Sequence, residues 1–184
     1  MLPRNIALIL VAAQKAWDEP YWGRRNNPGA EACQAAVLEA FRQSGLEVVH
    51  VRRDSRDPNC PLYPGEPGNE FKEATAPREP ETVLRTSGHS AFAGTGLEAH
   101  LRGRGIDRLV LAGFTTGHGI SSTARAACDL GFKTLVLRDA CVAFELEDVD
   151  GQRLPAQALH QAALAELLGE YAMVLPTEAI LQLL

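Results

Sequence analysis

The sequence lacks the features that mark several broad classes of protein. It contains no run of lysine and arginine, and its 184 residues carry a formal net charge of −5, which argues against a surface for nucleic acid or for an anionic membrane. No Cys-x-x-Cys pair occurs among the four cysteines, so we expect neither a zinc site nor a disulfide framework. The cysteines are Cys33, Cys60, Cys128 and Cys141. The first ten residues lack the length and cleavage pattern of a signal peptide, and we expect a cytoplasmic protein with no membrane partner.

Hydrophobic periodicity is missing from residues 53–80, which hold six of the eleven prolines. A loop of this length in a compact domain is usually functional or disordered. It carries several carboxylates, but no histidine lies at ligand spacing, so a solvated loop is favoured over a metal site. We therefore expect no metal and no cofactor, and a small molecule as the ligand.

The apolar residues that are present predict alternating strands and helices. With 46% hydrophobic and 22% charged residues, the chain can bury one core, and residues 1–184 are expected to form a single domain. Apolar runs predict strands at 6–11, 46–51, 82–85, 108–113, 134–137 and 173–175. Helical periodicity predicts helices at 29–44, 95–104, 116–130 and 156–170. This alternation predicts an α/β fold, a three-layer α/β/α doubly wound sandwich with a six-stranded, mostly parallel sheet.

Two helix starts are predicted from capping residues. Thr95 and Glu98 have the spacing of a capping box, which would open the helix that runs to about residue 104. Thr177 can cap a final short helix.

Residues 109–125, LVLAGFTTGHGISSTAR, predict a buried strand that turns directly into a helix. In an open α/β sheet, ligands bind at the carboxyl ends of the strands, and free N–H groups at the start of the following helix favour an anion or a developing oxyanion. This stretch alone is equally compatible with a plain connection between a strand and a helix.

The same stretch resembles the signature G-[VLF]-[ST]-T-x-x-C-V-x-x-T-A-R of the isochorismatase-like cysteine hydrolases. The matching positions are Gly113, Phe114, Thr115, Thr116, Thr123, Ala124 and Arg125. Further matches run nearly end to end, through the first strand with Gln14 and the motifs DEPYWGRRNNP, HVRRDS, PLYPGEPGNEF and HSAF-x-GT-x-LEAHL. On these residues the chain is identified as a member of the family, and the resemblance implies a homo-oligomer, either a dimer or a tetramer.

The resemblance also implies a catalytic triad, and all three of its positions differ in this chain. The family uses an Asp as base and acid, a Lys that balances charge, and a Cys as covalent nucleophile. These positions hold Ala12, Thr86 and Gly119 here. Because losses within a triad cost about 10³- to 10⁶-fold in rate, we do not expect the family's covalent acyl-enzyme chemistry in this chain.

Other parts of the family site do not depend on these side chains. The resemblance places an oxyanion hole at the backbone N–H groups of Thr115 and Gly119. It also implies a cis peptide between Phe114 and Thr115. By position, the substrate contacts would include Ala12, Gln14, Thr86 and Phe114.

Two histidines occur near the altered positions. His89 lies in the segment before the SAF motif, and His118 directly precedes Gly119. Either could transfer a proton near neutral pH, although a hydrogen-bonded loop histidine is the simpler interpretation of each. Arg85 could replace the missing cation, but as the strand neighbour of Thr86 it should point to the opposite face of the sheet.

An aromatic segment after the first strand is a candidate pocket wall. Trp17, Tyr21, Trp22 and Arg24 combine rings with a guanidinium, a set suited to stacking on a ring and binding an anion. Packing in the core or at a subunit interface explains the same residues equally well.

Three functions remain open at this point. The first is an enzyme that acts on a small cyclic or carbonyl-containing metabolite by acid–base chemistry from His89 or His118, without a covalent intermediate. The second is a catalytically inactive homologue that binds a metabolite or a partner subunit. The third is a structural subunit that pairs with an active relative. The sequence does not choose among them.

Overall fold

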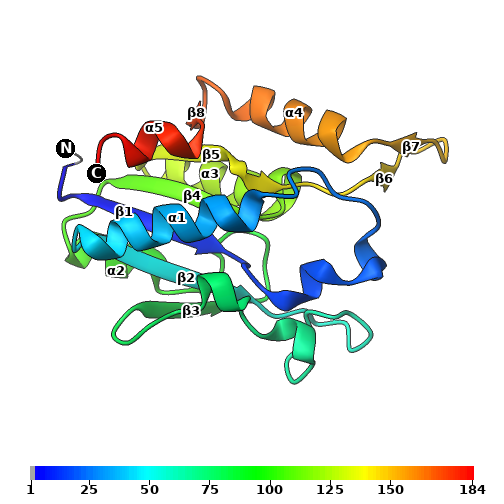
Figure 1. The fold of residues 1–184 in the computed structure, drawn as a ribbon, viewed down its shortest axis with the longest axis horizontal. Coiled ribbons are helices and arrows are strands. Elements are labelled where there is room, and N and C mark those ends of the chain that lie inside the picture. Colours follow the sequence, from blue (N-terminus) through cyan, green and yellow to red (C-terminus); the bar gives the residue numbers. More distant parts are fainter. Residues whose placement is uncertain (1–2) are drawn as a thin grey trace.

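The computed structural model describes residues 3–184 and shows an α/β fold built on a six-stranded parallel sheet (Figure 1). The strand order is β3-β2-β1-β4-β5-β8, and every neighbouring pair is parallel. The strands are β1 (Ile6–Val11), β2 (Glu47–Arg53), β3 (Thr82–Thr86), β4 (Arg108–Phe114), β5 (Lys133–Val142) and β8 (Met173–Leu175). The helices are α1 (Ala30–Gln43), α2 (Leu97–Gly103), α3 (Ser121–Asp129), α4 (Ala156–Leu167) and α5 (Thr177–Leu181). The predicted fold class is confirmed.

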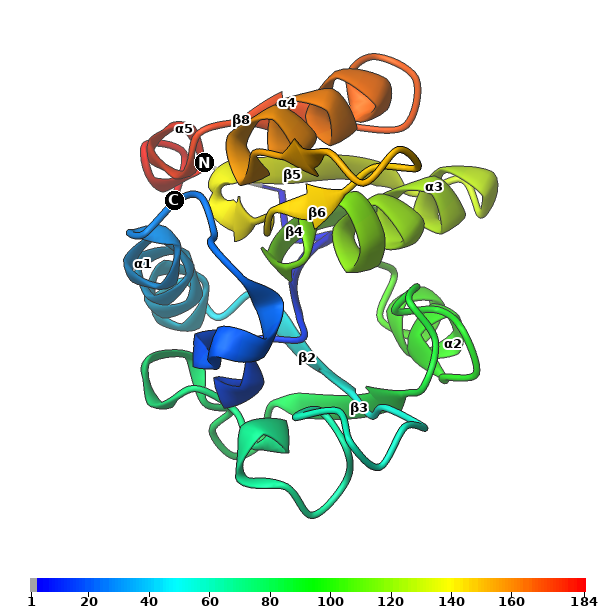
Figure 2. The ribbon, with the colours of Figure 1, turned by 90° about the vertical axis from the view of Figure 1, so that its right-hand side faces the viewer.

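Helices cover both faces of the sheet because its central strands are apolar on both sides (Figure 2). All six residues of β1 are buried, as expected for a central parallel strand. Alternate β1 residues pack in opposite directions: Ile6, Leu8 and Leu10 join a core with α1 and α5, whereas Ala7, Ile9 and Val11 join the core that contains α2, α3 and α4 residues. No helix within residues 3–184 is long and apolar enough to cross a membrane.

The strand order reverses at β1, which fixes where a ligand can bind. From β1 the chain adds β2 and β3 on one side, and it then crosses back to place β4, β5 and β8 on the other. Loops that leave β1 and β4 therefore diverge at the carboxyl edge of the sheet, where open α/β folds form a crevice.

The end of β5 differs most from the prediction. The strand continues to Val142 instead of ending at residue 137, with a register shift against β4 between Leu111 and Gly113. A two-stranded hairpin follows, formed by β6 (Leu146–Glu147) and β7 (Arg153–Leu154), and Figure 1 shows it projecting beyond the sheet at the start of α4. Strands of two residues are too short to produce a recognisable periodicity, so the sequence did not indicate this hairpin.

Both predicted helix caps are wrong in detail. Gly96 is the N-cap of α2, and Glu98 pairs with Arg102, so it does not return to Thr95 as a capping box requires. Thr177 is the first residue of α5, and its N–H and hydroxyl both donate to Asp139 Oδ1, at 2.8 and 2.7 Å. A side chain from β5 therefore caps this helix.

Candidate functional site

A cavity of about 480 Å³ lies at the carboxyl edge of the sheet. Its wall collects residues from the segments after β1, β3, β4 and β5, from the end of β2 and from α4. The lining residues are Trp17, Trp22, Arg53, His89, Thr115, Gly117, His118, Ser121, Ala143, Phe144, Leu146, Leu159, Ala162, Ala163 and Glu166. The volume falls within the range of about 300–1,000 Å³ that is typical of small-molecule pockets.

The two candidate histidines meet in this cavity. The ring centroids of His89 and His118 are 5.8 Å apart, and both rings remain accessible to solvent. His118 Nδ1 lies 2.9 Å from the hydroxyl oxygen of Thr115, which fixes the orientation of that ring. Partial burial lowers the pKa of each imidazole, and the Arg53 guanidinium lowers the pKa of both further. Both rings are therefore neutral at neutral pH and can accept a proton.

The turn after β4 is a π-helical turn, Thr116–Ile120, and not the first turn of an α-helix as predicted. Thr115 precedes this turn, and its carbonyl accepts hydrogen bonds from the N–H groups of His118 and Ile120. The peptide between Phe114 and Thr115 is cis, which confirms that prediction. Of the two predicted oxyanion-hole positions, Thr115 lines the cavity, whereas Gly119 is buried behind it.

Aromatic rings form one wall of the cavity. Trp17 is 3% exposed and stacks on Phe114, with ring centroids 5.6 Å apart and an interplanar angle of 4°. Trp22 and Phe144 pack around Trp17 and also line the cavity. The indole N–H of Trp17 donates to the carbonyl of Ala12 at 2.6 Å. Trp17 and Trp22 thus pack against each other and also line the cavity, whereas ring stacking and anion binding by this segment stay predictions.

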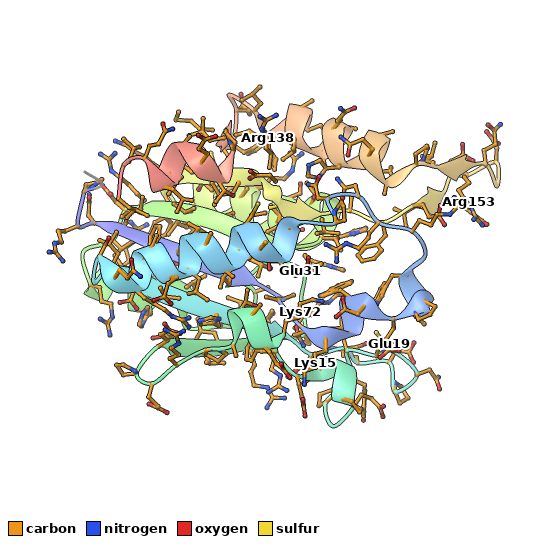
Figure 3. All side chains as sticks on the ribbon, viewed as in Figure 1. Lys15, Glu19, Glu31, Lys72, Arg138 and Arg153 are labelled. Atoms are coloured by element: carbon orange, nitrogen blue, oxygen red, sulfur yellow. The ribbon has the colours of Figure 1, made fainter. Side chains whose placement is uncertain are left out.

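An ion-pair cluster supports this wall from behind. Lys72 Nζ lies 2.5 Å from Asp18 Oδ1 and 3.3 Å from Glu31 Oε1, and Figure 3 shows Lys72 and Glu31 close together beneath α1. The ammonium also lies 5.6 Å from the centre of the Phe114 ring. Lys72 thus ties the proline-rich loop to α1 and to the aromatic wall.

Several predicted contact residues are close to the cavity but do not line it. Ala12, at the end of β1, is buried with a φ of 50°, and the Thr86 hydroxyl donates to the carbonyl of Ala93 at 2.7 Å. Gln14 accepts a hydrogen bond from the N–H of Arg53 and donates to the carbonyls of Arg53 and Asn69, so it joins the end of β2 to the proline-rich loop. Phe114 is covered by Trp17.

Tyr21 and Arg24 lie on the surface. Tyr21 is 59% exposed and meets Trp22 edge to face. The Arg24 side chain is 86% exposed and borders a different cavity, next to Glu145. Arg85 pairs with Asp54 at 2.8 Å and is not part of the cavity wall.

Sequence reasoning missed Arg53, which the structure places in the cavity wall. The predicted strand ended at residue 51, whereas β2 extends to Arg53, whose register partner in β3 is Thr86. Extending the strand by two residues would have placed Arg53 at the carboxyl edge, on the face shared with Val49 and Val51.

None of the four cysteines lines the cavity. Cys60 and Cys141 are buried, and burial raises the pKa of the Cys141 thiol to about 12. Within residues 3–184, no group of three or more His, Cys, Asp or Glu side chains could hold a metal ion. The homo-oligomer stays a prediction.

The comparisons with known proteins place these observations in a family. The sequence pattern of the Isochorismatase domain matches residues 7–179. The uncharacterized isochorismatase family protein YrdC of Bacillus subtilis is 35% identical over 175 residues, which cover 95% of this chain and 94% of that protein. The maleamate amidohydrolase of Pseudomonas putida is 34% identical over 156 residues, 76% of this chain and 72% of the enzyme.

Solved structures show the same architecture. A protein from Chromobacterium violaceum, described as a hydrolase of the isochorismatase family, superposes with a TM-score of 0.94 at 42% identity, covering 99% of this chain and 94% of the other. An isochorismatase hydrolase structure from Oleispira antarctica gives a TM-score of 0.89 at 32% identity, with coverage of 99% and 98%.

Proposed function

The chain belongs to the isochorismatase family, and from that membership we propose that it is an enzyme that acts on a small carbonyl-containing metabolite without a covalent intermediate. His89 and His118 would move the protons, and backbone N–H groups of Thr115 and of the turn that follows it would stabilise the developing oxyanion. The observation that carries this proposal is the meeting of two accessible imidazoles in one cavity.

The state of the imidazoles supports a role in proton transfer. Because partial burial and Arg53 lower both pKa values, each ring is available as a base at neutral pH. When His118 Nδ1 donates to Thr115, its Nε2 is left as the acceptor. A base in this position can activate a water molecule for attack on a bound carbonyl carbon.

The absence of a cysteine from the cavity wall supports a reaction without a thioester intermediate. Gly119 takes the position that the family resemblance gives to the nucleophile, and a Cβ atom there would lie 2.6 Å from the carbonyl oxygen of Phe114. The packing of this turn therefore leaves room for glycine, and not for a side chain, at position 119. The relatives named maleamate amidohydrolase and streptothricin hydrolase are hydrolases by name, which favours hydrolysis as the reaction class.

The test is untargeted mass spectrometry of a metabolite pool incubated with the protein. Three samples are compared: wild type, the double variant His89→Ala/His118→Ala, and the control His100→Ala, which removes a histidine paired with Glu47 outside the cavity. Circular dichroism and thermal unfolding establish that each variant is folded. We expect at least one compound to be consumed by wild type and by His100→Ala, and spared by the double variant.

Two results would contradict the proposal. If the double variant consumed the compound as fast as wild type, neither histidine would be needed for the reaction. A compound that co-purifies with the protein and is never consumed would favour an inactive homologue that binds a metabolite.

A further inference from the structure

The Arg53 side chain is half-buried and makes no hydrogen bond or ion pair with any described residue from 3 to 184. Its Nε atom is inaccessible to solvent and has no partner. Other arginines with little exposure are paired: Arg25 contacts both carboxylate oxygens of Glu31 at 2.7 and 2.8 Å, and Arg42 contacts those of Glu81 at 2.6 and 2.8 Å. A guanidinium carries five N–H donors and stays charged in proteins, so burial without a partner is unfavourable.

The backbone around Arg53 is held firmly. Its N–H donates to Gln14 Oε1 at 2.8 Å, and its carbonyl accepts from Gln14 Nε2 and Asn69 Nδ2. Strand alternation directs Arg52 to the opposite face, where its Nε donates to the carbonyl of Asn69. The backbone of Arg53 is therefore held by Gln14 and Asn69, while its guanidinium makes no hydrogen bond within residues 3–184.

The charges that face the cavity leave Arg53 without a counterion. His89 and His118 are neutral at neutral pH because their pKa values are lowered, and the remaining charged residue of the wall is Glu166. Glu166 is already paired with Arg125, at 2.8 Å between Nη2 and Oε2, on the rim formed by α3 and α4. Arg53 is therefore a cation without a counterion in the cavity wall, in a chain whose net charge is −5.

We propose that Arg53 binds the carboxylate of the substrate, which is a small amphipathic carboxylic acid. The planar fork of a guanidinium matches the two oxygens of a carboxylate. The cavity wall also supplies an apolar surface for the rest of the molecule, through Phe144, Leu159, Ala162 and Ala163. The reacting carbonyl of a molecule held at Arg53 would then lie in the same cavity as the two imidazoles.

This inference rests on the proposed function, because it names the substrate class of the same site. Binding can nevertheless be measured without turnover. An experiment can therefore refute the carboxylate site at Arg53 without refuting the histidine chemistry, and the reverse. The probes are benzoate and its neutral analogue benzamide, which share a planar apolar ring and differ in charge. Both are titrated at pH 7.5 into ¹⁵N-labelled protein and followed by NMR, with inorganic phosphate as a competitor.

Arg53→Gln and Arg85→Gln form a matched pair of variants. Arg53 and Arg85 lie on neighbouring strands, but Arg85 is exposed and paired with Asp54 outside the cavity. We expect benzoate to bind wild type and Arg85→Gln at least about ten-fold more tightly than benzamide, since a hydrogen bond to a charged partner contributes a factor of about 10–150. Arg53→Gln should bind the two probes equally. Removal of the cation should also raise the pKa of both cavity histidines, measured from their ring-proton shifts.

The outcomes separate the claims. Equal binding of benzoate and benzamide by wild type, or a benzoate preference that survives Arg53→Gln, would overturn the inference, as would phosphate displacing benzoate at equal concentration. If Arg53→Gln does not fold, Arg53→Lys, which keeps the charge and loses the fork, should bind benzoate more weakly than wild type, and unchanged affinity would refute the role of the fork. A wild type that prefers benzoate but consumes no metabolite would retain the binding site and refute the proposed chemistry.

Discussion

Gly117 and Gly119 lie in the same π-helical turn, but only one of them has room for a side chain. A Cβ atom at Gly119 would lie 2.6 Å from the carbonyl oxygen of Phe114 and 3.2 Å from Val11 Cγ1. At Gly117, no atom lies within 4 Å of the added Cβ. The first contact at Gly119 is with a backbone atom, which cannot move aside by rotating a side chain.

The pair Gly119→Ala and Gly117→Ala therefore tests the packing of this turn. Overpacking costs about 1–3 kcal/mol, whereas replacing an unstrained glycine by alanine stabilises a chain by about 0.4–1 kcal/mol through the entropy of the unfolded state. We expect Gly119→Ala to reduce the free energy of unfolding and Gly117→Ala to leave it unchanged or raise it slightly. For a protein of this size, each kcal/mol shifts Tm by about 2–4 °C.

Urea unfolding followed by circular dichroism measures both variants under the same conditions. Equal stabilities of the two variants would refute the tight contact at Gly119. The contact also bears on a restored nucleophile, because Gly119→Cys would meet the same carbonyl oxygen, and the turn would have to shift before a thiol could face the cavity.

Two further predictions concern stability. Burial opposes ionisation of Glu81, but hydrogen bonds from Arg42 and His50 help to lower its pKa to about 2 from 4.5. The ionised form therefore stabilises the fold above pH 4.5, and about 2 kcal/mol of this should be lost between pH 6 and pH 3. In urea unfolding, the free energy of unfolding of Glu81→Gln should fall by about 2 kcal/mol less than that of wild type between pH 6 and pH 3. An equal fall in the two proteins would contradict the assignment. Asp139→Ala removes the bonds to Thr177 that cap α5 and should cost about 0.5–2 kcal/mol. A Tm equal to that of wild type would show that this cap contributes nothing.

The fold was predictable because its strands are apolar runs, a signal that does not depend on distant contacts. The expected strand 6–11 matches β1 residue for residue. The predicted ends of strands and helices were wrong where contacts between distant segments determine them. β5 continues past residue 137 because it pairs with the end of β4 across a register shift, and Asp139 caps a helix nearly forty residues away. Neither contact leaves a local pattern in the sequence.

The candidate site was predictable only in part. His89 and His118 were identified as polar residues near the altered family positions, and the structure brings their rings to 5.8 Å. Arg53 was missed because the predicted strand ended at residue 51, whereas β2 continues to Arg53, where it still pairs with β3. The part of the wall that α4 contributes was also missed, because its contact with the turn after β4 joins segments that are distant in the sequence.

The central claim is that histidines, and not a thiol, carry the chemistry of this cavity. The most direct measurement is the consumption of a metabolite pool by wild-type protein treated with iodoacetamide in the folded state, which reaches the partly exposed thiols of Cys33 and Cys128, compared with untreated protein and with the His89→Ala/His118→Ala variant. The account predicts that treated and untreated wild type consume the same compound at similar rates, and that the double variant leaves it intact. Loss of consumption on thiol blocking, with the double variant still active, would contradict the account.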